Sequence, residues 1–189
     1  MDYLKDVDCE EDVAVLRELF VEYAESLGFE LCFQHFDDEL EELPGAYAPP
    51  SGGALLAVDG GRAVGCVAMR RLDDATCEMK RLYVRPGHRG RGTGRVLVDA
   101  IVGRAKEAGY SRMRLDTVAQ MMAAKALYRS VGFVETEAYC LNPLEGAEYF
   151  ELALASDPPG GTGAGAGGTD MPTGDGAEGP DGHVREGDD

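Results

Sequence analysis

The chain has 189 residues, of which 44% are hydrophobic, enough for one domain with a sizeable core, and its formal net charge is −17. Such acidity disfavours binding to nucleic acid or to an anionic membrane surface, because both need a basic protein face. No apolar run approaches the roughly 18–20 positions of a membrane span. The first residues, MDYLKDVDCEED, lack the basic start and apolar middle of a secretion signal, so we expect a cytoplasmic protein.

The five cysteines are odd in number and form no CxxC pair, which predicts reduced thiols rather than disulfides or a zinc ribbon. Cys32 and His35 are the one close Cys/His pair, and two ligands are fewer than a zinc site needs, so no metal is expected. The chain has 14 Arg and 4 Lys beside its excess of acidic residues. That composition fits either a halophilic source or a GC-rich genome.

The first elements in chain order are a strand and a helix. MDYLKDV has the pattern of a short strand, and apolar side chains in residues 13–27 recur every three or four positions, as on one face of a helix. Asp8 and Glu11 have the spacing of a capping box at the start of that helix, and Gly28 marks its end. A second, shorter helix is predicted over FDDELEEL.

The middle of the chain alternates strands and helices. ALLAVDGGRAVGCVAMRRL predicts two strands joined by a tight turn at Asp59-Gly60-Gly61, and CEMKRLYVR predicts a third. A helix ending near Gly109, the strand RMRLDTV, the helix MMAAKALYRSVGF and a final antiparallel pair, FVETEAY and AEYFELAL, follow. Because strand, helix, strand is the parallel crossover unit, this order predicts an α/β fold with a sheet of mixed direction.

The composition changes near residue 156. Residues 156–189 contain eleven glycines and eight carboxylates with only isolated apolar side chains. Such a segment cannot bury enough surface to offset its chain entropy, so it is predicted to be a disordered acidic Gly-rich tail, in which His183 is inert.

A positive, glycine-rich loop stands out in this acidic chain. RPGHRGRGTGR, residues 85–95, places four arginines and four glycines between a strand and a helix. Glycines let backbone N–H groups approach a ligand, and a helix start adds unpaired donors and the positive end of the dipole. The loop is therefore either a phosphate site or a solvated basic turn. Its spacing excludes the GxxxxGK[ST] loop and the GxGxxG dinucleotide fingerprint.

The same loop contains the pattern [RQ]xxGx[GA], as Arg89-Gly90-Arg91-Gly92-Thr93-Gly94. With EMKRLYV, MRLDT and MMAAKALYRSVGF in this order, the chain resembles the GNAT superfamily of acyl-CoA-dependent N-acyltransferases from about residue 8 to 155. The resemblance implies an acetyltransferase domain over residues 1–155. It also implies a mixed, mostly antiparallel sheet with a splayed central parallel strand pair and flanking helices.

The resemblance further implies that acetyl-CoA is the co-substrate. In this family the backbone of the glycine loop holds the pyrophosphate, and the pantetheine arm pairs with the preceding strand. The residues at the matching positions are Leu82, Tyr83 and Val84 on the strand and Arg89, Gly90, Arg91, Gly92, Thr93, Gly94 and Arg95 in the loop. Many members place an asparagine early in the last helix, where this chain has Gln120, Met121 and Met122.

Glu78 matches the general base of the family. We expect Glu78 to share a strand face with Lys80, Leu82 and Val84 and to point toward the acyl group. A carboxylate with an ordinary pKa near 4.3 needs burial or a water chain to deprotonate an alkylammonium. The alternative is a surface carboxylate paired with Lys80 or Arg81.

Tyr128 resembles the tyrosine that protonates the departing coenzyme thiolate in many family members. A phenol with a pKa of about 10 is a suitable acid for a thiolate of similar basicity. The alternative is a core tyrosine at helical spacing. Cys77, next to Glu78, is expected to face the other side of its strand.

Together these features predict direct transfer of an acetyl group from acetyl-CoA to a primary amine within a ternary complex. The acceptor is expected to be a small molecule or a peptide, and the carboxylates of HFDDELEELPGAY indicate either a cationic amine or a solvated helix face. The alternative function is an acyl-CoA-binding sensor without turnover. We expect a monomer or homodimer that binds neither nucleic acid nor membranes.

The tail gives the first testable prediction. Because residues 156–189 are predicted not to fold, a protein truncated after Ser156 should keep the melting temperature and the acetyl-CoA affinity of the full chain. Thermal unfolding and calorimetric titration of both proteins measure the two quantities. A loss of several degrees on truncation would contradict the prediction.

Overall fold

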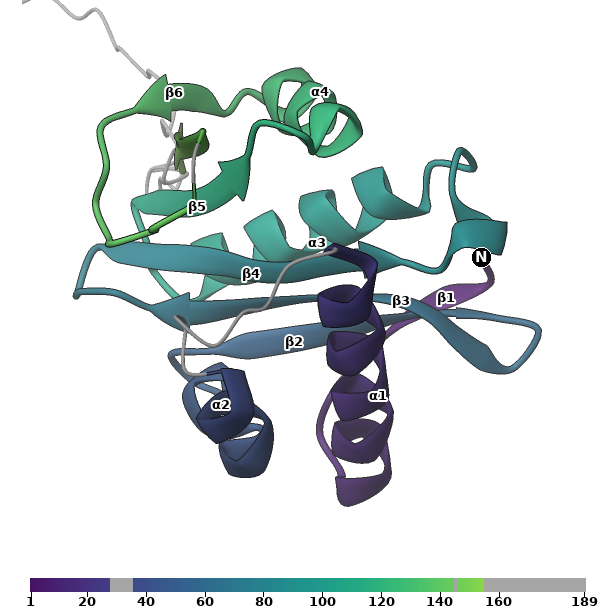
Figure 1. Cartoon of the computed structure of the whole chain (residues 1–189). Helices are drawn as coiled ribbons and strands as arrows, with labels where there is room; N and C mark the ends of the chain where they lie inside the picture. Colours follow the sequence, from purple (N-terminus) through teal and green to yellow (C-terminus); the bar gives the residue numbers. More distant parts are fainter. Residues whose placement is uncertain (28–35, 145, 155–189) are drawn as a thin grey trace, which may run out of the picture. The chain divides into compact units, whose positions relative to one another are not determined.

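The computed structural model describes residues 1–27, 36–144 and 146–154, in which helices cover both faces of a seven-stranded sheet (Figure 1). The strand order is β1-β2-β3-β4-β5-β7-β6, and every neighbouring pair is antiparallel except β4 and β5. This confirms the mixed, mostly antiparallel sheet. The strands are β1 Tyr3–Asp6, β2 Gly53–Asp59, β3 Arg62–Arg71, β4 Thr76–Val84, β5 Arg112–Val118, β6 Val134–Thr136 and β7 Ala147–Ala153.

Four α-helices and two short 3-10 turns connect these strands: α1 Glu10–Leu27, α2 Phe36–Glu42, η2 Gly45–Tyr47, η3 Pro86–His88, α3 Thr93–Glu107 and α4 Met122–Val131. All the predicted helices are present. In the part of the chain that the structure describes, no helix combines the length and apolar character that crossing a membrane requires. Gly28, Cys32, His35 and residues 156–189, with the predictions made for them, lie outside the described residues.

The hairpin between β2 and β3 forms where Asp59-Gly60-Gly61 predicts it. Asp59 pairs with Arg62, which leaves Gly60 and Gly61 as a two-residue loop with φ of 58° and 73°. A two-residue hairpin with positive φ at both loop positions is a type I′ turn, which glycine adopts without steric cost.

The start of α1 differs by one residue from the predicted capping box. The backbone oxygen of Cys9 accepts the first helical hydrogen bond, from the N–H of Val13 at 3.1 Å, and α1 begins at Glu10. Counted from Cys9 as the N-cap, the third helical residue is Asp12, whose Oδ2 accepts a hydrogen bond from the Cys9 thiol at 3.1 Å. Asp12 is buried and also accepts a hydrogen bond from the Lys5 Nζ at 2.7 Å.

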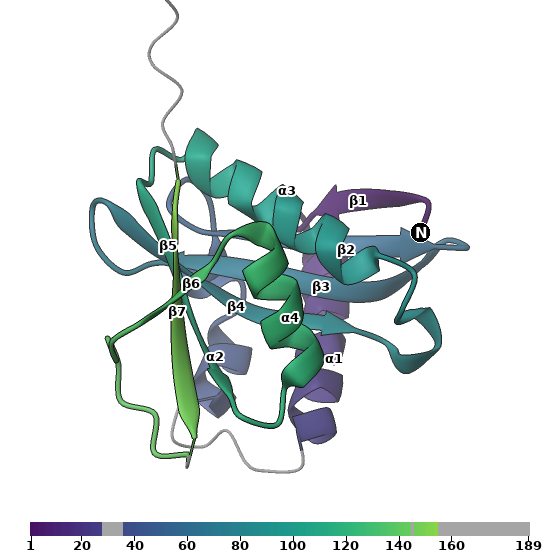
Figure 2. The ribbon, with the colours of Figure 1, turned by 90° about the horizontal axis from the view of Figure 1, so that it is seen from above.

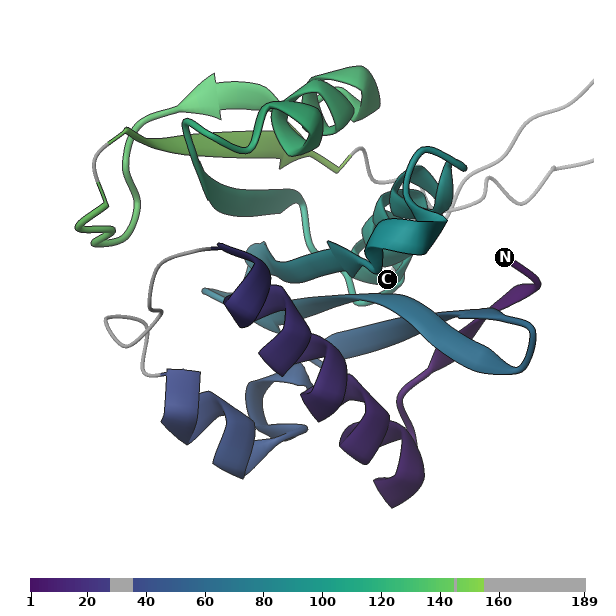
Figure 3. The same ribbon diagram turned by 45° about the vertical axis from the view of Figure 1, so that its right-hand side comes forward.

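The sheet separates two apolar cores. One lies between the sheet and α3 and contains Leu97, Val98 and Ile101, and the other lies under α1 and α2 and contains Leu16, Leu19 and Phe20 (Figures 1 and 3). Successive residues of a strand point to opposite faces, so a central strand is apolar at nearly every position. β2 and β3 show this pattern, because each contributes side chains to both cores.

Strand β4 carries a bulge at Arg81. Lys80 pairs with Ala68 of β3 and the next pair joins Tyr83 to Cys66, so two residues of β4 lie opposite one residue of β3. Arg81 has φ of 58° and, among the described residues, no other non-glycine residue has a positive φ. The left-handed conformation costs such a residue roughly 1–2 kcal/mol, so neighbouring contacts must hold it.

The bulge overturns one expectation from the sequence. Cys77 and Met79 lie in the α3-side core, so Glu78 faces the α1 side, but Leu82 and Val84 pack against the α3-side core. The prediction that Glu78 shares a face with Leu82 and Val84 is wrong, because the extra residue reverses the two-residue alternation at this point.

An ion pair with α2 holds the bulge in place. The Arg81 Nε donates to the Glu39 Oε1 at 2.9 Å, the Nη2 donates to Oε2 of the same carboxylate, and the Tyr47 hydroxyl donates to Oε1 at 2.7 Å. The guanidinium also lies over the Tyr23 and Phe36 rings. Burial alone would raise the pKa of Glu39, but the hydrogen bonds from Arg81 reverse this effect and hold that pKa below its ordinary value.

Substituting Glu39→Gln should destabilise the fold, because Arg81 would remain buried without its counterion. We expect the free energy of unfolding near neutral pH to fall by about 3 kcal/mol, as for other broken buried pairs. Since the folded-state pKa of Glu39 is depressed, the ion pair stabilises above the unfolded pKa of about 4.3 and loses its effect as the pH falls through the folded value. The difference in the free energy of unfolding between the wild-type protein and Glu39→Gln should therefore become smaller in acid.

Denaturant titrations between pH 3 and pH 7 test this prediction. Glu42→Gln is the matched control, because Glu42 is exposed on the same short helix. It should change the stability by less than about 0.5 kcal/mol. Equal losses in the two variants would mean that the ion pair does not support the bulge.

Candidate active site

The two parallel strands separate after a short stretch of pairing. Residues 76–78 of β4 pair with residues 112–114 of β5, and both strands then continue, to Val84 and to Val118, with no further β4–β5 pair among the described residues. On its other edge β5 stays paired with β7 along its whole length. This separation confirms the splayed central parallel pair.

A cavity of about 930 Å³ opens where the strands separate. Its walls come from the C-terminal end of α1, from the last residues of β4, from the glycine loop with the first turn of α3, and from the β5–α4 connection with α4 (Figure 2). It is lined by Tyr23, Ser26, Leu27, Leu82, Tyr83, Val84, Arg89, Gly90, Gly92, Thr93, Gly94, Arg95, Val118, Gln120, Met121, Met122, Ala123, Ala124, Leu127 and Leu144.

Nine of the ten residues expected to contact the coenzyme line this cavity, and the tenth, Arg91, does not. Arg91 is exposed in the loop. Sequence spacing alone cannot separate Arg91 from Arg89 and Arg95, because the direction of a loop side chain depends on local φ and ψ. His88 of the same loop is half-buried beside Asp59, with its Nδ1 3.2 Å from the Asp59 Oδ2, and it is absent from the cavity wall.

The loop has the geometry of an anion cradle. Gly90 and Gly92 have φ of 73° and 83°, and Gly92 is the N-cap of α3. A Cβ placed on either glycine would meet no atom within 4 Å, so the backbone here faces open space. The first N–H groups of a helix have no acceptor within the helix, and the helix dipole adds partial positive charge there. Backbone donors and positive charge therefore meet at the cavity wall.

Two arginines border this cradle in fixed positions. The Arg89 Nε donates to the Val84 carbonyl at 2.7 Å, and its guanidinium lies over the Tyr83 ring. Arg95 is bound by Asp99, one turn further along α3, with Nε–Oδ distances of 2.8 Å. Both side chains are exposed and retain free guanidinium surface toward the cavity.

A second, smaller pocket of about 40 Å³ adjoins the first on the α1 side of the sheet. The two share five lining residues: Tyr23, Leu27, Val118, Met121 and Leu144. The smaller pocket adds polar groups, among them Lys80 of β4, Asp116 of β5 and Asn142 of the β6–β7 connection. The Lys80 Nζ lies 3.2 Å from the Asp116 Oδ1, and the Asn142 Nδ2 donates to the Asp116 Oδ2 at 2.8 Å.

Glu78 lies next to this pocket, fully buried. Its Oε2 accepts a hydrogen bond from the Arg70 Nε at 2.7 Å, its Oε1 accepts one from the Tyr139 hydroxyl at 2.9 Å, and the Lys80 Nζ lies 3.8 Å away. The alternative, a surface carboxylate paired with Lys80 or Arg81, is therefore wrong in placing Glu78 at the surface. Its expected contact with Lys80 is present. Cys77 faces the other side, as expected, and its burial raises the pKa of the thiol to about 12.

Tyr128 is buried on α4, with its ring between Phe133 and Phe150 at centroid distances of 5.9 and 6.2 Å. Its hydroxyl makes no hydrogen bond to any residue that the structure describes. Burial raises the pKa of Tyr128, which keeps the phenol protonated near neutral pH. Ala124 and Leu127 of the same helix line the cavity, whereas Tyr128 is not among the lining residues and packs in the α3-side core.

Several polar residues of this region were not assigned a role from the sequence: Arg70, Asp116, Tyr139 and Asn142. For Asp116 a signal exists, because it is the one carboxylate of the predicted strand RMRLDTV, and a carboxylate that is buried in a sheet must have polar partners. Tyr139 lies 61 residues from Glu78, and no local pattern announces their contact.

The five carboxylates of the α2 segment divide into two kinds. Glu39 is bound to Arg81, whereas Asp37, Asp38, Glu41 and Glu42 are exposed. For Asp37, Glu41 and Glu42, the solvated helix face is the better description.

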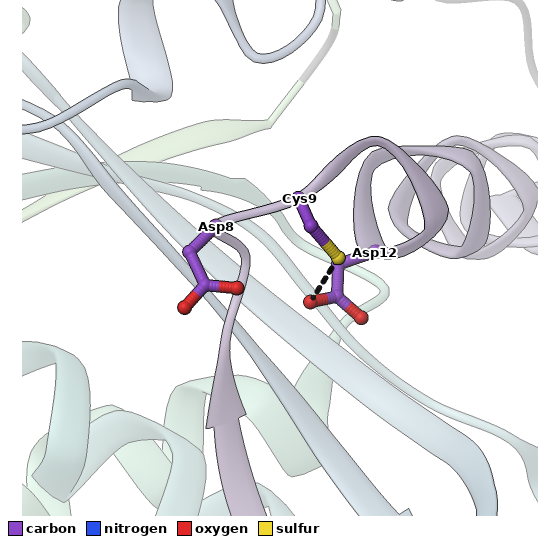
Figure 4. Close-up of side chains that lie close together, drawn as sticks. All are labelled: Asp8, Cys9 and Asp12. Carbon is purple, nitrogen blue, oxygen red and sulfur yellow. Dashed lines mark hydrogen bonds between the residues drawn. The ribbon is translucent and has the colours of Figure 1, made fainter.

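The described residues contain one further group of possible metal-ligand type, Asp8, Cys9 and Asp12 at the start of α1 (Figure 4). Asp12 already accepts hydrogen bonds from Lys5 and from the Cys9 thiol. These contacts give the group a structural role in starting α1.

Known proteins share this architecture. Residues 13–133 match the family model described as the Acetyltransferase (GNAT) family. An uncharacterized N-acetyltransferase of Schizosaccharomyces pombe is 42% identical over 147 residues, which cover 77% of this chain and 90% of the relative. An N-acetylaspartate synthetase of Danio rerio is 37% identical over 124 residues, which cover 60% of this chain and 43% of the relative.

Among solved structures, a Salmonella typhimurium protein determined with its cofactor acetyl-CoA superposes with a TM-score of 0.59. The match covers 85% of this chain and 98% of that protein at 20% identity, so it establishes the shared fold.

Substituting Gly92→Val tests the cradle. A β-branched residue at φ of 83° is strained, and its side chain would stand where the loop backbone faces the cavity. We expect the affinity for acetyl-CoA to fall about thirtyfold or more, as for the loss of two charge-assisted hydrogen bonds, and calorimetric titration measures it.

Gly87→Val is the matched control. Gly87 belongs to the same loop, has no positive φ, and is absent from the cavity wall. It should leave acetyl-CoA affinity unchanged. If folded Gly92→Val protein binds acetyl-CoA as tightly as the Gly87 variant does, the loop is only a turn.

Proposed function

Because this chain belongs to the GNAT family of acetyltransferases, we propose that it transfers an acetyl group from acetyl-CoA directly to a primary amine within a ternary complex. The observation that carries the proposal is the cavity in which the left-handed glycines at the start of α3 meet the free end of β4. The smaller polar pocket beside it offers a place for the amine.

The chain's own residues fit the coenzyme that this function needs. Backbone N–H groups of residues 90–95 would bind its pyrophosphate, with Arg89 and Arg95 adding charge at the rim. The edge of β4 from Leu82 to Val84 is unpaired toward β5, and it would bind an extended amide-bearing arm by main-chain hydrogen bonds. Acetyl-CoA supplies the activated thioester.

The acceptor amine must lose a proton before it can attack. We assign this step to the carboxylates on the α1 side of the sheet, Glu78 and Asp116, which Lys80 contacts from between them. Asp116 lines the smaller pocket directly, and Glu78 lies behind it. Burial tends to raise the pKa of Asp116, but Lys80 and Asn142 hold it below its ordinary value, so Asp116 is ionised near neutral pH and has an oxygen that can accept a proton.

Tyr128 is assigned as the proton donor to the departing thiolate. Burial keeps its hydroxyl protonated, and Ala124 and Leu127, its neighbours on α4, line the cavity.

The Danio rerio relative is named an N-acetylaspartate synthetase, and the match covers less than half of it, so the acceptor class for this chain must come from its own residues.

The direct test of this function is release of CoA from acetyl-CoA in the presence of a panel of primary amines, with mass-spectrometric identification of the acetylated product. Sustained release with an acetylated amine supports the proposal. Tight acetyl-CoA binding with no turnover of any amine would instead support the alternative, an acyl-CoA-binding sensor.

Tyr128→Phe separates a catalytic tyrosine from a core tyrosine. The substitution keeps the ring between Phe133 and Phe150 and removes only the hydroxyl. We expect kcat to fall about 10²-fold to 10⁴-fold with KM for acetyl-CoA nearly unchanged, the usual effect of losing a positioned acid. Steady-state kinetics measures both constants.

Tyr110→Phe is the control for losing a buried phenol. Its hydroxyl donates to the Ser51 carbonyl at 2.7 Å, and it lines neither pocket. It should lower the melting temperature slightly and leave kcat unchanged. Wild-type turnover in Tyr128→Phe would refute the assignment.

A further inference from the structure

A row of alternating charges crosses the sheet beside the smaller pocket. Arg70 of β3 pairs in register with Glu78 of β4, Glu78 with Arg114 of β5, and Arg114 with Glu151 of β7. These residues follow core residues of the α3 side, so their side chains face the α1 side, where the pocket lies. Two arginines therefore flank the buried Glu78 on neighbouring strands.

Each of these arginines donates to one carboxylate of the described residues, and the Arg114 guanidinium also lies over the Tyr139 ring. The Arg70 Nε donates to Glu78 and the Arg114 Nε donates to Glu151, at 2.7 and 2.6 Å. Within the described ranges, the Nη groups of both side chains donate no hydrogen bond. Since a guanidinium carries five N–H donors, four remain on each arginine. The side chains are 39% and 28% exposed, so a ligand can reach them.

The carboxylates of the same region are already engaged. Glu78 accepts hydrogen bonds from Arg70 and Tyr139, and Asp116 accepts one from Asn142 and contacts Lys80. The region is thus short of free acceptors and rich in free donors. A ligand that brings acceptors, such as a carboxylate, complements it better than a polycation does.

The spacing limits the size of this ligand. Arg70 and Arg114 stand one strand either side of Glu78, so their Cα atoms are roughly 10 Å apart, within reach of one shared group for two arginine side chains. Lys80 and Asp116 lie two residues further along β4 and β5, roughly 7 Å away. A carboxylate at the arginines would thus leave an amine a few bonds away at the pocket that adjoins the coenzyme cavity.

We propose that the Nη groups of Arg70 and Arg114 bind a carboxylate of the acceptor, and that the acceptor class is therefore the amino acids, small amines that carry a carboxylate. This inference rests on the proposed function and names its substrate class. The overall acidity of the chain does not oppose it, because the exposed Nη groups are local donors and the nearby carboxylates are hydrogen-bonded.

Matched acceptors test the substrate class. CoA release is measured with L-aspartate and L-alanine, with the carboxamides of the same amino acids, with ethylamine, and with spermidine as a polycation. We expect at least one of the two amino acids to be acetylated with kcat/KM tenfold or more above that of its carboxamide and of the other amines.

Variants test the two arginines. Arg70→Lys keeps the charge beside Glu78 and loses the planar fork, and Arg114→Gln removes the partner of Glu151 and the contact with the Tyr139 ring. Both arginines are partly exposed, so both variants should fold. Each should raise KM for the amino acid about tenfold to a hundredfold, the effect of one or two charge-assisted hydrogen bonds, with KM for acetyl-CoA unchanged. Arg104→Gln, at an exposed arginine of α3 that pairs with Asp6 and Glu107, is the control and should change neither constant.

The outcomes separate the two claims. Preference for an amino acid that both arginine variants weaken supports the inference. Faster acetylation of a carboxamide or of spermidine, or arginine variants that behave like Arg104→Gln, overturns the inference while the proposed function stands. No acetylation of any amine by protein that binds acetyl-CoA overturns both.

Discussion

The separation of β4 from β5 is the constraint on which the rest of the site depends. Paired strands satisfy each other's backbone N–H and C=O groups, so two parallel strands that part after three residue pairs leave polar edges that need other partners. The bulge at Arg81 accompanies this separation, and the ion pair with Glu39 of α2 holds the bulge from the side of the sheet that α1 and α2 cover. A helix outside the cavity thus stabilises the strand that shapes it.

The bulge also divides the chemistry between the two faces. Before the bulge, β4 directs Glu78 and Lys80 toward the α1 side of the sheet. After the bulge, Leu82 and Val84 point toward the α3-side core. The larger cavity therefore has mostly apolar and glycine walls with Arg89 and Arg95 among them, whereas the adjoining pocket is polar. In the proposed function, the amine would lie in the polar pocket and the acetyl group beside it in the larger cavity.

Much of this arrangement follows from local sequence patterns. The hairpin at Gly60-Gly61, the order of the strands and helices and the glycine loop before α3 all depend on neighbouring residues, and the structure has them where the sequence predicts them. The side of the sheet to which Leu82 points could not be predicted from the sequence, because the bulge depends on pairing with β3 and on the distant Glu39.

The cluster of polar residues around Glu78 could not be predicted from the sequence either. Arg70, Glu78, Arg114 and Tyr139 come from three strands and a connection, and only strand register brings them together. Sequence spacing identified Glu78 as polar on a strand but gave no basis for its burial or its partners. A long-range contact of this kind becomes visible only when the sheet order is known.

The measurement that tests the central claim most directly is calorimetric titration of the unmodified protein with CoA and, separately, with pantetheine, which lacks the nucleotide and its pyrophosphate. If the glycine loop is a phosphate cradle at the end of the separated strands, CoA should bind once per chain, and pantetheine should bind at least about tenfold more weakly. Equal affinity for the two compounds, or no binding of CoA, would contradict the account.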